Sequence, residues 1–128
     1  MIDVRRLGQI ILARLVDEVP ELGGRVYDRA AEDTAFPYLT MGPLYGVDDR
    51  AECIDAEEWT IQLDVWDKAS NKLRATDVVQ KVSAALRDWS DVDQVTMHPL
   101  RVVMAQVMDD PTPGVIHGVV QVEASVEG

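Results

Sequence analysis

The sequence predicts an α+β fold, with two helices packed on one face of a mainly antiparallel sheet of four to five strands. Two observations predict this fold. Apolar residues recur at helical spacing in two separate segments, and other segments alternate apolar and polar residues as strands do. The resulting order is helix, strands, helix, strands, which is neither strict strand–helix alternation nor an all-strand pattern. No repeat, linker or change of composition divides the chain, so we expect residues 1–128 to form a single domain.

The first helix is expected from about Asp3 to Glu18. Val4, Leu7, Ile11 and Leu15 recur at helical spacing, and Asp3 is placed to cap the first turn. The second helix is expected to start after Ser70 or Asn71, which can act as a cap, and to end near Asp88. Its apolar stripe consists of Ala75, Val78, Val79, Val82, Leu86 and Trp89.

The clearest strand runs through Trp59, Ile61, Leu63 and Val65, which alternate with polar residues. Gly118 in the last predicted strand marks either a bulge, a close backbone approach or a plain packing position. The other expected strands are Arg25–Asp28, Pro37–Met41, Val95–Met97, Arg101–Met108 and Val115–Val126. Between two of the strands, Gly42–Ala56 contains turn formers and acids with little periodicity, so we expect a long, projecting hairpin loop.

The chain is acidic, with 12 Lys and Arg against 23 Asp and Glu and a net charge of −11. This charge repels phosphate, which argues against nucleic acid as the main partner and leaves proteins or small molecules. No apolar run approaches the roughly 20 residues needed to cross a bilayer, and the N-terminal segment reads as an amphipathic helix and not a signal peptide. A single cysteine, Cys53, cannot form an internal disulfide, which favours manufacture in a reducing cytosol.

Residues suited to catalysis or metal binding do not occur in a useful pattern. Cys53 lies near Glu52 and Asp55, whose charges disfavour a reactive thiolate. His98 and His117 are not at a metal-ligand spacing, and there is no phosphate loop or nucleophile elbow. We therefore expect no enzyme, no catalytic residue, no metal and no cofactor.

Charge is distributed unevenly along the middle of the chain. Eight acids and one base occupy Asp48–Asp67, whereas five bases and one acid occupy Lys68–Arg87. On the second helix, Asp77 and Lys81 stand at the favourable i,i+4 spacing, on the same face as Arg74. Two interpretations stay open for Arg74 and Lys81: a solvated helix face, or a charged contact to a neighbouring subunit.

Several runs resemble the tail-completion, or tail terminator, family of long-tailed phages, prophage-derived particles and gene transfer agents. These runs are "GGRVYD", "FPYLTMG", "LDVWDKAS", "AALRDW" and "MDDPTPGVIHGVVQVEA", and they extend over nearly the whole chain. The resemblance implies a structural virion protein of small α+β fold. Such a protein is made in the host cytoplasm and forms a ring, typically a hexamer, at the neck of the particle.

The resemblance also implies partners. The ring would bind the tail-tube protein, stop its polymerisation and present its other face to a head-side connector or stopper protein. DNA would pass through the channel only as cargo, and no membrane is involved. In this setting the Gly42–Ala56 loop is the expected projecting arm, with candidate interface residues near its tip: Val47, Asp48, Asp49, Arg50 and Glu52. An ordinary flexible hairpin loop is the alternative interpretation of this segment.

Two other functions stay open. The first is a different head–tail joining, or neck, component, which would share the small α+β scale and charged loops. The second is a small acidic domain unrelated to phages, in which the open sheet face holds a ligand.

Overall fold

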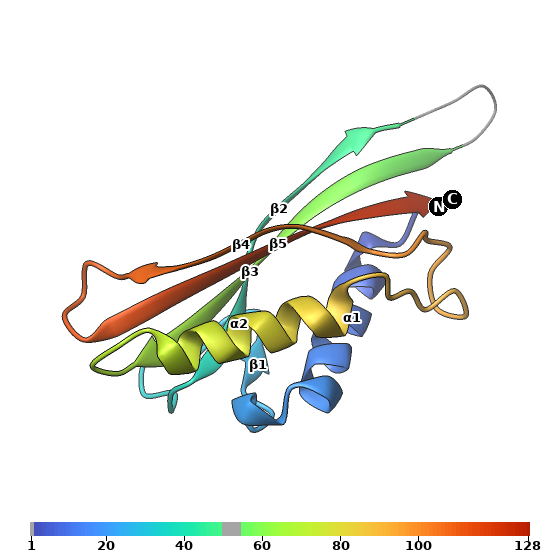
Figure 1. Ribbon diagram of the computed structural model, residues 1–128. Helices are drawn as coiled ribbons and strands as arrows, with labels where there is room; N and C mark the ends of the chain where they lie inside the picture. The colour runs from blue at the N-terminus through green and yellow to red at the C-terminus, as the bar shows by residue number, and fades with distance from the viewer. Residues whose placement is uncertain (1, 50–54) are drawn as a thin grey trace.

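A computed structural model describes residues 2–49 and 55–128. In chain order the elements are α1 (Val4–Glu18), the 3-10 helix η1 (Pro20–Leu22), β1 (Val26–Tyr27), β2 (Tyr38–Asp48), β3 (Ala56–Lys68), α2 (Leu73–Leu86), β4 (Arg101–Asp109) and β5 (Val115–Glu127). The strands form one sheet in the order β1-β2-β3-β5-β4, in which β1 and β2 are parallel and the other pairs antiparallel. Both α-helices of the described chain lie on one face of the sheet (Figure 1). The predicted α+β fold is confirmed.

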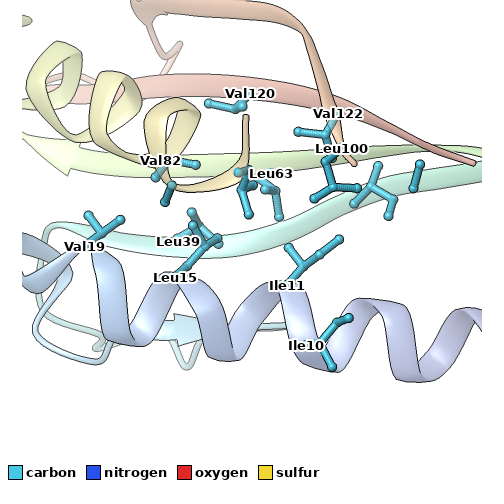
Figure 2. Close-up of a cluster of buried hydrophobic side chains, with 14 of the residues drawn as sticks. Ile10, Ile11, Leu15, Val19, Leu39, Leu63, Val82, Leu100, Val120 and Val122 are labelled. Carbon is cyan, nitrogen blue, oxygen red and sulfur yellow. The ribbon is translucent and has the colours of Figure 1, made fainter. Parts of the chain in front are cut away.

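Helix α1 forms as its sequence pattern predicts. The Asp3 carboxylate accepts a hydrogen bond from the backbone N–H of Arg6 at 2.9 Å, which caps the first turn. Leu7, Ile11 and Leu15 are fully buried. Figure 2 shows Ile11 and Leu15 directed toward the sheet, so the apolar side of α1 covers the core.

Helix α2 is shorter than predicted at both ends. The Asn71 side chain accepts a hydrogen bond from the N–H of Leu73 at 3.0 Å, but the residue in the cap position is Lys72. The helix ends at Leu86, and Asp88 adopts a left-handed φ of 61° that turns the chain away. The predicted apolar stripe is buried, except that Trp89, beyond the helix, is half-buried at the edge of the core.

Strands β3 and β5 form the centre of the sheet, and they are paired from Ala56↔Glu127 to Lys68↔Val115. Gly118 lies in β5 directly under α2. A Cβ atom there would collide with Cγ2 of Val79 and would lie 3.3 Å from Cβ of Val65. Of the alternatives for Gly118, the packing position is the correct one, because the missing side chain leaves room for the side chains of Val79 and Val65 and so allows α2 to pack against β5.

The prediction for Gly42–Ala56 is wrong in extent. Strand β2 does not end at Met41 but continues to Asp48, and its partner β3 begins at Ala56. A bulge between Met41 and Leu44 contains Gly42 and Pro43, which the sequence pattern presents as turn residues. Gly46 is required in the strand, because a Cβ at this position would collide with the indole ring of Trp59. Within the described residues, the segment expected as a loop is therefore largely paired strand.

Two short strand predictions are also corrected. The strand predicted at Arg25–Asp28 is limited to Val26–Tyr27, which pair with Leu39 and Thr40. The segment predicted as a strand at Val95–Met97 forms an isolated bridge between Met97 and Val126. Its apolar side chains, Val95 and Met97, are buried against the core, but Pro99 lies two residues after Met97 and has no N–H to extend a ladder.

Candidate assembly interface

The distal half of β2, Leu44–Asp48, forms an arm with the facing part of β3, and the hairpin projects away from the helices (Figure 1). Val47 is 58% exposed and Tyr45 60% exposed. Tyr45 pairs with Thr60, and Val47 pairs with Glu58. Thr60 and Glu58 are on the polar side of β3, which faces away from the helices, and paired residues share a face, so Tyr45 and Val47 lie on the sheet face opposite the helices. Tyr45 and Val47 are therefore two large apolar side chains exposed on the same face of a regular strand.

The structure places the predicted arm residues in two different settings. Val47 and Asp48 lie within β2 and not at a loop tip, which corrects the expected position. Asp49 lies just beyond the strand, and its N–H donates to the carbonyl of Ala56 at 3.0 Å. Arg50 and Glu52 lie outside the described residues, as does Cys53. The contact role assigned to these residues stays a prediction.

Arg74 makes a strong contact within its own chain. Its Nε and Nη2 atoms donate to the carboxylate of Asp67, with Nε 3.0 Å from Oδ2, and the N–H of Lys68 donates to the same carboxylate at 2.8 Å. Asp67 is fully buried. The hydrogen bonds from Arg74 hold the pKa of Asp67 below its usual value. Arg74 therefore has a structural task, whatever else its exposed surface contacts.

Lys81 also has partners in its own chain. It contacts the carboxylates of Glu21 and Asp77, the latter at 3.0 Å, so the predicted i,i+4 pairing is confirmed. The hydrogen bond to Glu21 and then that to Asp77 raise the pKa of Lys81. The side chains of Lys81 and Asp77 are about half exposed and that of Glu21 is partly exposed, so solvent screens this cluster and its contribution to stability is small. A subunit contact through Lys81 stays a prediction.

Arg74 and the arm lie at opposite ends of β3. Asp67, the partner of Arg74, is ten residues from Glu57 in the arm, or roughly 33 Å along an extended strand. The structure therefore does not combine the candidate residues of the arm and of α2 into one site.

The helix-free face of the sheet carries a polar cluster that the sequence reading did not identify. His117 Nε2 is 2.7 Å from Asp64 Oδ1, and the imidazole stacks on the Trp66 indole with 4.1 Å between ring centroids. Gln62 donates to the same Asp64 oxygen at 3.0 Å, and Gln121 donates to Gln62 at 3.0 Å. The only sequence signal was that polar residues occupy the alternate positions of two strands that turn out to be paired.

The chemistry of this cluster is that of hydrogen bonding within the chain. No group of three or more His, Cys, Asp or Glu side chains suited to a metal ion occurs in the described part of the chain. His98, the other histidine, is exposed and lies 3.4 Å from a Glu127 oxygen. Within residues 2–49 and 55–128 no helix is long and apolar enough to cross a membrane.

Two grooves lie along the borders of the sheet, and the sequence did not predict either of them. The larger, about 660 Å³, runs between α2 and β4 and is lined by small and apolar residues that include Val79, Ala84, Ala105 and Val107, together with Arg87. The second, about 310 Å³, lies between α1 and β2 and is lined by residues that include Gly8, Leu12, Met41 and Leu44. Each groove adjoins a strand at or near an edge of the sheet.

Comparison with known proteins gives the family. The structure is similar to a chain in the virion of a native gene transfer agent particle, with a TM-score of 0.79, 19% sequence identity and coverage of 92% of each chain. It is also similar to the gp17 protein of bacteriophage SPP1, with a TM-score of 0.62, 20% identity and coverage of 95% of this chain and 89% of that one. These likenesses show a shared fold.

No curated protein matches by sequence. The sequence profile of the family described as tail completion protein gp17 matches residues 10–127. The chain therefore belongs to the phage tail completion protein gp17 family.

Proposed function

We propose that this tail completion protein forms a ring, typically a hexamer, on the head-proximal end of a tail tube. There it stops addition of tube subunits and presents its opposite face to a head-side connector or stopper protein. The observation that carries this proposal is family membership across residues 10–127. The fold shared with a chain of a gene transfer agent virion supports it.

The arm offers a physical means for such an assembly. Beyond Leu39 and Thr40, which pair with β1, the outer border of β2 has no strand partner in the described chain. Free backbone groups beside exposed Tyr45 and Val47 form a surface that another chain can bind by strand addition and apolar contact. Binding of another chain to the arm would then depend on the fit between the two surfaces. The protein would act by assembling with its partners and not by catalysing a reaction.

The net charge fits the proposed position. DNA passes through the neck of a tailed particle, and a chain with a charge of −11 repels its phosphates. We therefore propose that DNA crosses the ring without binding tightly. The protein would be assembled in the host cytoplasm and remain in the neck of the finished particle.

A head–tail joining protein without a terminating role is the alternative within the same particle. Removing the gene from a producing cell separates the two functions. Loss of a terminator should give tubes longer than those of the parent particle, with free heads, whereas loss of a joining protein should give free tails of normal length. Particles of normal length with heads attached would contradict both. The hypothesis of a ligand-binding domain unrelated to phages is disfavoured by the family membership.

The arm can be tested separately. Deleting residues 47–52 removes Val47, Asp48 and Asp49, which are exposed, and none of the described core residues, so we expect the monomer to fold and melt much as the parent does. We expect such a variant to lose attachment of heads to tails in a complementation assay. An exposed loop segment of equal length, residues 29–34, provides a matched deletion control. Infectious or transducing particles formed with the arm deleted would contradict the role of the arm.

A further inference from the structure

The two borders of the sheet are different and both are open. On one side, β4 (Arg101–Asp109) is the last strand in the sheet order. On the other side, β2 is covered by the two-residue strand β1 only at Leu39 and Thr40. Pro43 lacks an N–H and lies in the bulge, so the regular stretch of this border that has no second strand beside it among the described residues is Leu44–Val47. A single chain therefore carries two unlike strand borders with unpaired backbone groups among its described residues.

The groove beside β4 has the form of a site for an added strand. Ala105 and Val107 face the helix side, because their partners Val120 and Gly118 do so. A strand laid against β4 would insert every second side chain between these residues and α2, where Ala84 and Ser83 leave room. The site therefore calls for a strand with one moderate apolar side chain on its helix-facing side.

The arm of β2 matches this requirement. Leu44 pairs with Ile61 and so lies on the helix side, and it is 40% exposed. Its neighbour on that side, Gly46, adds no bulk, while Tyr45 and Val47 lie on the other face. An arm placed beside β4 of the next copy would thus bury Leu44 in the groove. The sheets of the two copies would then form one continuous sheet.

Strand direction and charge agree with this pairing. Along the sheet β2, β3, β5 and β4 are antiparallel in turn, so β2 and β4 of one chain run in opposite directions. A rotation about an axis roughly along the strands preserves these directions, and the arm would meet β4 of the next copy as an antiparallel neighbour.

The N–H of Asp88 donates to Leu100 at 2.9 Å, which places Arg87 at the start of β4. The acidic end of the arm, Asp48 and Asp49, points toward this end of the sheet.

Arg87 strengthens the match in charge. It lines the groove, is exposed, and has no ion pair with any carboxylate in the described part of the chain. In a protein of net charge −11, an unpaired cation beside an apolar groove favours an occupant with an acidic end.

From these features we infer that the β2 arm of one copy adds antiparallel to β4 of the next, with Leu44 in the groove between α2 and β4. The inference rests on the ring formation proposed above and names the surfaces that close the ring. Two unlike borders make a head-to-tail contact, which repeats around a circle when the rotation closes. Other occupants of the groove, such as a tube subunit or a second β4, are outcomes that the test below separates.

Disulfide trapping tests the pairing. In a Cys53→Ser background, Leu44→Cys is combined with Ala105→Cys or, to allow for register, with Val107→Cys. Both pairs place their sulfurs on the helix side, and the pair that lies directly opposite in the true register would come within the short reach that a disulfide requires. The matched control is Tyr45→Cys with Ala105→Cys, in which the two thiols lie on opposite faces of the joined sheet.

The expected result, after mild oxidation of rings on tail tubes, is a ladder of covalent oligomers for at least one same-face pair, several-fold above the opposite-face control. Single-cysteine variants should give no ladder, and dimers from Leu44→Cys or Ala105→Cys alone would overturn the inference in favour of like-with-like pairing. Rings that form without same-face cross-links would overturn the inferred pairing of β2 with β4, while the proposed ring formation would still stand. If the parent chain forms no ring on tubes, the proposed function fails as well, and electron microscopy of the same samples distinguishes the two failures.

Discussion

Replacing Arg74 by methionine should destabilise the folded chain, because it leaves a buried carboxylate without its cation. Asp67 is fully buried, whereas the Arg74 side chain is 55% exposed. After the substitution, the N–H of Lys68 at 2.8 Å remains as the donor to Asp67 among the contacts described above. Hydrogen bonds to charged groups contribute about 1.5–3 kcal/mol, and solvent screening of the exposed guanidinium favours the lower half of that range. We expect a loss of about 2 kcal/mol in the free energy of unfolding at neutral pH.

Urea unfolding followed by circular dichroism measures this loss. The pKa of Asp67 is lowered in the folded chain, so the contribution of the pair is present above the unfolded value of about 3.9 and disappears as pH falls through the folded pKa. The difference between parent and Arg74→Met should therefore shrink in acid. Lys81→Met, which breaks a solvent-exposed cluster, is the control and should have a clearly smaller effect. Equal stability of parent and Arg74→Met at neutral pH would refute the structural role; loss of tube capping without loss of stability would instead support the subunit contact.

Two further predictions concern packing and assembly. Gly118→Ala should cost about 1–3 kcal/mol because its Cβ collides with Val79, and adding Val79→Ala should recover part of that loss in a denaturation cycle; simple additivity would contradict the close contact. Ala84→Trp should fill the groove beside β4 and prevent ring formation while the monomer melts normally, whereas Ala13→Trp, on the exposed side of α1, should assemble as the parent does. Rings formed equally well by both tryptophan variants, visible by electron microscopy, would contradict the use of that groove.

The helices and the central strands were predictable because their side chains alternate between core and solvent with a fixed period. Leu7, Ile11 and Leu15 repeat every four residues and are buried, and the alternation of β3 survives in the structure. The family resemblance was likewise readable from sequence, and the profile match confirms it. These features depend on local order, which a single sequence displays directly.

The arm and the grooves were not predictable in the same way. Gly42, Pro43 and Gly46 are turn formers in isolation, yet the first two occupy a bulge and the third lies beneath Trp59. Their strand conformation is fixed by pairing with β3, a contact that the local pattern does not contain. The cluster of His117 with Asp64 depends in the same way on the register between β3 and β5. Val47 and Asp48, which the sequence pattern places near a loop tip, therefore lie within β2.

The central claim is that the chain caps tail tubes as a ring. The most direct measurement combines the purified protein with the tail-tube subunit during polymerisation, and records tube lengths and end views by electron microscopy, with mass in solution measured in parallel. We predict a closed ring on one end of each tube and shorter tubes as the protein concentration rises. A protein that remains monomeric beside tubes of unchanged length, with bare ends, would contradict the claim.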